Sequence, residues 1–229
     1  MTDSKFIEKY DNPTIRTLIQ LVPFGVGSAL DVALSETIEG IREKRSQIFF
    51  DELSKGNIEL TEDAINNEEF LHSYFSTRRA AANTYRKEKI ETFAKLFKNG
   101  IVDRNTSNPE EYEDYLKLID QLSFLDMSLL FEIKQFEEEY PNKRGQQENK
   151  PFVEPMDVLP DWHGEMFNII ERLNISEDEL RLRLYRLQSM GLFERSITVK
   201  GEISVIDNPD FVGRLTPIAN KLFELIKEN

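Results

Sequence analysis

The sequence contains no cysteine, and this absence removes several classes of site at once. Without a thiol the chain has no disulfide, no zinc–thiolate or iron–sulfur centre and no cysteine nucleophile. Histidine is almost as scarce: His72 and His163 are separated by a proline-rich stretch and lack the acidic spacing that is typical of a metal motif. We therefore expect no metal and no cofactor.

Long apolar runs are also missing. The first nine residues lack the apolar core of a signal peptide. The most apolar stretch, 18–34, is interrupted by Pro23, by glycines and by polar residues, whereas a membrane-spanning helix needs roughly 20 mostly apolar residues. We expect a soluble, cytoplasmic protein, with a peripheral membrane contact through residues 21–26 as the alternative.

Positive charge is in deficit. The 229 residues carry 29 Lys and Arg against 42 Asp and Glu, a formal net charge of -13. Because a protein must offer cations to phosphates to release counterions, this balance disfavours broad nucleic-acid binding. The chain is 39% hydrophobic, which is enough for a core. Its length suits one large domain or two small ones, and we favour two.

Apolar residues recur mainly at steps of three and four, so the pattern predicts a mainly α-helical protein. A long amphipathic helix is expected over about 28–55, and a clear apolar stripe marks another at 90–97. We predict a helical domain over 1–122 and a second domain over 123–229. A proline-rich linker or insertion at 141–160 interrupts the second domain.

The C-terminal part has a more specific order of elements. Ser176 and Glu179 form a capping box, and Gly191 ends the helix that follows. Two short β-prone runs, 197–199 and 202–206, predict a small β-hairpin, and Thr216 with Pro217 opens a terminal helix. Helix, turn, helix, hairpin and helix is the order of a winged helix-turn-helix.

Three short motifs, at 22–31, 93–100 and 122–126, carry a family likeness. In these motifs the chain resembles a loose group of uncharacterised bacterial proteins of the Abi-alpha type, which are linked to abortive infection of phage-infected cells. The resemblance implies a helical protein of phage defence and carries over no catalytic residue. Residues 187–195 are similar to the segment that leaves the second helix in winged-helix proteins generally.

Motifs of known enzymes are incomplete here. Gly25 and Gly27 begin a dinucleotide fingerprint, but Leu30 stands where the third glycine is required. The lysine of a phosphate-binding Walker loop and the Gly-x-Ser-x-Gly elbow of hydrolases are both absent from the sequence. We therefore expect that the protein is not an enzyme.

Charge is unevenly distributed along the sequence between residues 78 and 140. Residues 78–104 hold eight Lys and Arg against three acids, whereas residues 106–140 hold two against ten. We favour the interpretation that these neighbouring helices offset each other's charge. The alternative is an anionic partner, a nucleic acid or a lipid head group. The residues that would contact such an anion are Arg78, Lys87, Lys95 and Lys98.

Two arginines occupy unusual positions if 78–97 forms one continuous helix. At 100° per residue, Arg79 and Arg86 then share a face with the apolar stripe at 90–97. A charge inside an apolar seam needs a carboxylate partner. We expect both to be buried in ion pairs, Arg86 with an acid such as Asp31 or Glu36.

The second helix of the predicted winged helix opens with three acids, 177–179, where a DNA reader would point at base edges. Its outer face instead combines apolar, aromatic and arginine residues, the composition of a protein contact. The contact candidates are Arg181, Leu182, Tyr185 and Arg186.

The sequence thus predicts a non-catalytic interaction or regulatory protein of a bacterium or phage, in phage defence if the resemblance holds. We expect it to bind another protein, or a second copy as a homodimer through the long helix at 28–55. The first alternative is a DNA-binding transcriptional regulator that uses the winged helix, and the second is a membrane-acting effector.

Overall fold

The computed structural model describes residues 12–20, 32–55, 66–103, 108–139, 162–195 and 213–227. Within these ranges the chain is mainly helical and has one small antiparallel sheet of two strands, so the prediction of a mainly α protein is confirmed. No helix in the described ranges combines the length and the apolar character that a membrane span requires.

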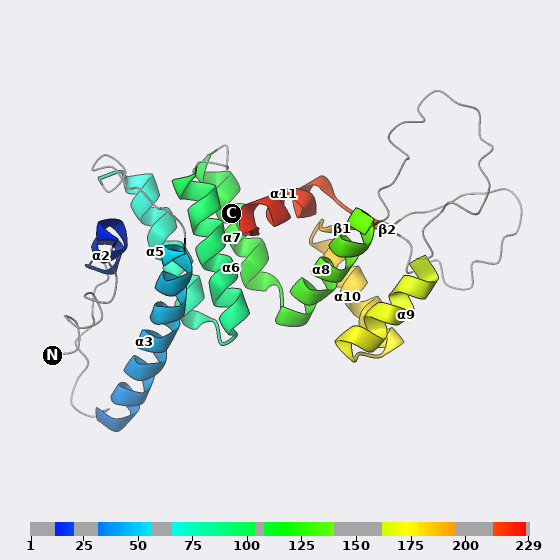
Figure 1. Ribbon diagram of the computed structural model, residues 1–229, viewed down its shortest axis with the longest axis horizontal. Helices are drawn as coiled ribbons and strands as arrows, with labels where there is room; N and C mark the ends of the chain where they lie inside the picture. The colour runs from blue at the N-terminus through cyan, green and yellow to red at the C-terminus, as the bar shows by residue number, and fades with distance from the viewer. Residues whose placement is uncertain are drawn as a thin grey trace, which may run out of the picture. The chain divides into compact units, whose positions relative to one another are not determined.

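Figure 1 shows the elements of the described residues and labels all of them except η1. They are α2 (Pro13–Gln20), α3 (Val32–Ser54), α5 (Glu68–Asn83), α6 (Lys87–Phe97), the π-helical turn η1 (Lys98–Val102), α7 (Pro109–Gln121), α8 (Phe124–Glu139), α9 (Trp162–Leu173), α10 (Glu177–Ser189), β1 (Phe193–Arg195), β2 (Gly213–Leu215) and α11 (Pro217–Ile226).

The chain divides into two compact units. Unit 1 comprises Met1–Gln121 together with Phe223–Asn229, and unit 2 comprises Leu122–Leu222. The helix α11 therefore begins in unit 2, and its last turn belongs to unit 1. The division into a helical domain over 1–122 and a winged-helix-like domain over 123–229 stays a prediction, and the predicted linker or insertion at 141–160 lies outside the described residues.

Unit 1 has a core that is rich in aromatic side chains. The rings of Phe70 and Tyr74 from α5 meet Phe97 from α6 edge-on or tilted, with centroids 5.6 and 5.7 Å apart. Such aromatic pairs are worth about 0.5–1.5 kcal/mol each beyond the area they bury. The Tyr74 hydroxyl donates a hydrogen bond to the carbonyl oxygen of Leu18, which fastens α2 to this core.

The helix α5 ends earlier than the sequence pattern suggested. Thr84 and Arg86 have extended backbones, with φ/ψ of -90°/134° and -83°/130°, and they separate α5 from α6. Three non-helical residues separate α5 from α6, so positions before and after them no longer follow one 100° spacing. Arg79 and Arg86 therefore do not share a face with the apolar stripe of α6. The prediction that these two arginines are buried is wrong, since both are exposed.

The partners suggested for Arg86 lie beyond what the structure describes. Asp31 is outside the described residues, and of Glu36 only the backbone is described. Arg78, the residue before Arg79, is the arginine that packs between α5 and α3.

In unit 2, α8 packs against α9, and β1 follows α10 directly. The strands β1 and β2 pair in antiparallel register, from Phe193 opposite Leu215 to Arg195 opposite Gly213. A Cβ atom at Gly213 would lie 2.1 Å from the Phe193 ring, so this position has room only for glycine. The predicted hairpin at 197–206 lies outside the described residues.

Local helix signals in unit 2 are confirmed. The Ser176 hydroxyl accepts a hydrogen bond from the Glu179 amide at 3.2 Å, as the capping box requires. Gly191 ends α10 with φ of +72°, a left-handed conformation that favours glycine. The Thr216 hydroxyl accepts a hydrogen bond from the Ala219 amide at 3.2 Å and caps α11.

Candidate functional site

The first turn of α10 carries three carboxylates, and two of them pair with arginines one turn later. Arg181 Nη2 lies 3.1 Å from Glu177 Oε1, and Arg183 Nη2 lies 2.6 Å from Glu179 Oε1. Acids near a helix N-terminus interact favourably with the helix dipole, and each acid stands four residues before its arginine, the favourable order. The charges of α10 therefore balance largely within the helix.

The start of α8 supplies a further carboxylate, that of Asp126, which is fully buried. The amide of Ser123 donates to Asp126 Oδ2 at 2.8 Å, and the amide of Asp126 donates to the Ser123 hydroxyl at 3.1 Å. This is a reciprocal capping box. Its Ser-x-x-Asp pattern is a local signal in the sequence at 123–126.

Asp126 also binds α10. Arg183 Nη1 donates to Asp126 Oδ1 at 2.8 Å and to the Ser123 hydroxyl at 3.1 Å, and Arg186 Nη1 lies 3.4 Å from Asp126 Oδ2. Burial alone would raise the pKa of Asp126. The hydrogen bonds from Ser123 and Arg183 and the charge of Arg186 outweigh burial and hold this pKa below its ordinary value. The carboxylate is thus ionised and ties α10 to the start of α8.

The outer face of α10 is left with its apolar side chains. Leu182 is 69% exposed and Tyr185 is 46% exposed. Of the four predicted protein-contact residues, these two point to solvent, whereas Arg181 and Arg186 pair with Glu177 and Asp126.

The four predicted anion-contact residues are not equally accessible. Arg78 is half-buried: it donates to Ser46 Oγ at 2.9 Å and lies over the Phe50 ring at 5.8 Å. Burial lowers the pKa of Arg78, although the nearby Tyr74 acts in the opposite sense. The structure therefore uses Arg78 in the packing of α5 on α3.

The three lysines among the predicted anion-contact residues also differ in their exposure to solvent. Lys95 lies 3.8 Å from Glu52, a residue of α3, and is half-buried. Lys87 is exposed and lies 3.4 Å from Glu91, and Lys98 is half-buried in η1. Of the four candidates, Lys87 is thus the exposed one.

The described residues contain no group of three or more His, Asp or Glu side chains that could hold a metal ion. His72 Nε2 lies 3.0 Å from Glu113 Oε1 in an exposed contact between α5 and α7. The side chain of His163 is outside the described residues.

No protein-family model, curated protein or solved structure matches this chain. The resemblance to Abi-alpha proteins therefore stays an expectation, and any proposal about function depends on the geometry above.

Proposed function

We propose that this chain is a non-catalytic interaction protein whose unit 2 is a winged-helix-like module that binds another protein through the outer face of α10. The order of α8, α9, α10, β1 and β2 supports the module, because three helices followed by two antiparallel strands is the order of a winged helix. The Abi-alpha resemblance supports a setting in bacterial phage defence, and a cytoplasmic location belongs to the same proposal.

The observation that carries the proposal is the charge pairing of α10. Its three arginines, Arg181, Arg183 and Arg186, each lie within 3.4 Å of a carboxylate oxygen of the same unit. With three acids and three bases, the helix has no net charge. A helix that reads DNA gains most of its affinity by giving cations to phosphates, so these arginines would have to break their ion pairs first.

The exposed side chains of α10 favour a protein partner. Leu182 and Tyr185 are three residues apart and so lie near one another on the helix surface. Tyrosine is enriched among the residues that contribute most to protein interfaces, and paired arginines around it form a polar rim. We infer a partner that offers an apolar side chain to this face.

The test places a photo-crosslinking amino acid at position 182 in the full-length protein in cells. The matched control places it at Gln135, which is exposed on α8 of the same unit, nine residues and so about two and a half helical turns after Asp126, where α8 meets α10. We expect one defined protein adduct from position 182, lost in a Tyr185→Ala background, and none from position 135. Tyr185→Ala should also weaken binding of the purified partner about tenfold or more.

Two results would contradict the proposal. One is a nucleic-acid adduct at position 182, which would favour the DNA-binding regulator. The other is an identical set of protein adducts from positions 182 and 135, which would show that the outer face of α10 has no specific partner.

A further inference from the structure

A second surface lies in unit 1, at the end of the bundle where α5 turns into α6. Arg78 Nη2 donates to Ser46 Oγ at 2.9 Å, and Arg45 Nη1 donates to the carbonyl oxygen of Ala82 at 2.6 Å. Position 46 of α3 thus lies beside position 78 of α5, and position 45 lies beside position 82. Residue numbers fall along α3 as they rise along α5, so the two helices are antiparallel. The part of α3 before Arg45 extends past the end of α5 (Figure 1).

This register gathers positive charge at one end of unit 1. Residues 42–45 of α3, 78–79 of α5 and 86–88 at the start of α6 carry seven Lys and Arg against two Glu, on a chain whose net charge is -13. We call this surface the basic end of unit 1. Its exposed members are Arg42, Lys44, Arg79, Arg86 and Lys87, and its half-buried members are Arg45 and Arg78.

Within the residues that the structure describes, the arginines of this surface on α3 and α5 form no ion pair with a carboxylate; these are Arg42, Arg45, Arg78 and Arg79. Arg42 and Arg79 are exposed, and Arg45 is half-buried on a carbonyl oxygen near the C-terminus of α5. Like charges that are close together repel, so an anion bound here would relieve an unfavourable arrangement.

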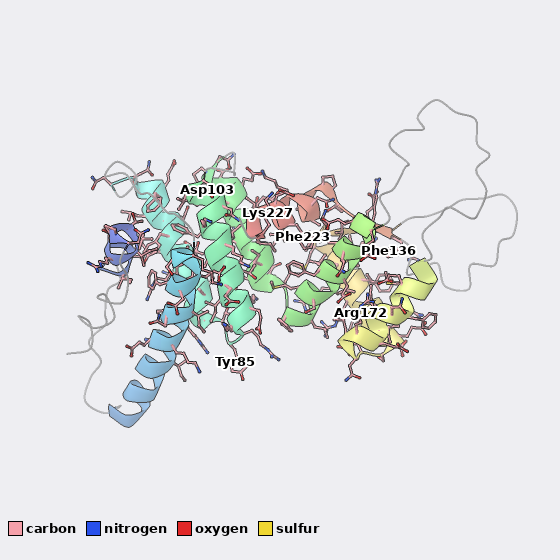
Figure 2. All side chains as sticks on the ribbon, in the orientation of Figure 1. Tyr85, Asp103, Phe136, Arg172, Phe223 and Lys227 are labelled. Carbon is pink, nitrogen blue, oxygen red and sulfur yellow. The ribbon has the colours of Figure 1, made fainter. Side chains whose placement is uncertain are left out.

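An aromatic ring stands beside these cations. Tyr85 is 82% exposed, and Figure 2 shows it projecting away from the helices at the α5–α6 turn. The guanidinium of Arg86 lies over the Tyr85 ring at 5.8 Å. The extended backbone of Thr84 and Arg86 holds the tyrosine at the tip of the turn, where no helix packing requires an aromatic residue.

We propose that the basic end of unit 1 binds single-stranded nucleic acid, with phosphates on the arginines and one base stacked on Tyr85. Exposed aromatic rings within a basic surface are how proteins bind single strands, because an unpaired base offers its face for stacking. A duplex has no unpaired base for Tyr85. The basic end carries a net charge of +5 (7 − 2), so the rest of the sequence carries -18 (-13 − 5), and the strand is attracted to this end and repelled elsewhere.

The test measures fluorescence anisotropy of labelled oligonucleotides about 20 nucleotides long, oligo-dT and oligo-U, with the full-length protein at rising salt. If four phosphates are contacted, the slope of log K against log salt is about -3, and affinity falls about 50-fold between 50 and 200 mM salt. The two oligonucleotides separate DNA from RNA as the source of the strand.

Variants locate the contact. Tyr85→Ala should weaken binding about 5- to 100-fold, whereas Tyr85→Phe keeps the ring and should bind normally. Arg79→Gln should reduce the salt slope by about 0.7. The control, Lys227→Gln, removes one exposed positive charge next to Asn99, twelve residues after Lys87 and so at the other end of the α6–η1 segment, and should leave binding unchanged. Circular dichroism checks that each variant is folded.

Three outcomes would overturn the proposal: no binding to either strand at 20 mM salt, equal binding of Tyr85→Ala and the wild type, or an equal affinity for duplex DNA. Binding to vesicles of anionic lipid without binding to oligonucleotides would assign the surface to a membrane and would also refute it.

Discussion

Replacing Asp126 by alanine tests whether the buried carboxylate joins α8 to α10. The carboxylate accepts a hydrogen bond from the Ser123 amide and another from the Arg183 guanidinium, both at 2.8 Å. A helix-capping bond is worth about 1 kcal/mol, and a bond between charged partners about 1.5–3 kcal/mol. We therefore expect Asp126→Ala to lower the free energy of unfolding by about 3 kcal/mol.

The assay is urea unfolding followed by fluorescence of the single tryptophan, Trp162, which lies at the start of α9 in unit 2. With a urea dependence of about 2 kcal/mol per molar, the midpoint should fall by about 1.5 M. The matched control is Glu179→Gln, which removes the exposed partner of the same arginine and should cost only about 0.3–0.5 kcal/mol.

The pH dependence gives an independent check. The pKa of Asp126 in the folded protein lies below its ordinary value of 3.8, so the folded state favours the ionised form. Its contribution is present above about pH 4 and is lost as the pH falls through the folded-state pKa. Asp126→Asn should remove this part of the acid sensitivity. If Asp126→Ala is no less stable than Glu179→Gln, the carboxylate does not hold the two helices together.

Three further predictions concern other contacts. Asn99 is buried and its amide donates to the carbonyl oxygens of Leu225 and Lys227 at 2.9 and 3.1 Å, so Asn99→Ala should cost about 1–3 kcal/mol in a thermal unfolding experiment. Burial raises the pKa of Tyr112, although the hydrogen bond with the Thr77 hydroxyl opposes this shift. The wild type should therefore lose stability as the pH rises above the ordinary value of 10.0, and Tyr112→Phe should lose less between about pH 9 and pH 11. Gly213→Ala should destabilise unit 2 by about 1–3 kcal/mol, measured by urea unfolding, because its methyl group would overlap the Phe193 ring.

Local signals in the sequence predicted local structure well. The caps at Ser176 and Thr216 and the helix end at Gly191 depend on residues within three or four positions of each other, so the pattern alone indicates them. The break after Asn83 has no glycine or proline to mark it. An apolar stripe that continues on both sides therefore suggested one helix where there are two.

Contacts between distant residues were the part that the sequence did not reveal. The pairing of Arg183 with Asp126 joins residues 57 positions apart, and Lys95 lies near Glu52, 43 positions before it. The distribution of charge along the sequence indicated an excess of Lys and Arg over 78–104. It did not show that Arg78 would pack against α3. Nor did it show that Arg42, on α3, would join the basic end of unit 1.

The division of α11 between the two units affects how the chain folds during synthesis. Asn99 donates to the backbone at Leu225 and Lys227, and these acceptors leave the ribosome about 100 residues after the last residue of α7. At about 5–20 residues per second, the helices of unit 1 are synthesised about 5–20 s before these two acceptors of the Asn99 amide. The first unit to be translated is thus completed last, and a chaperone that binds the nascent protein would meet unit 1 unfinished.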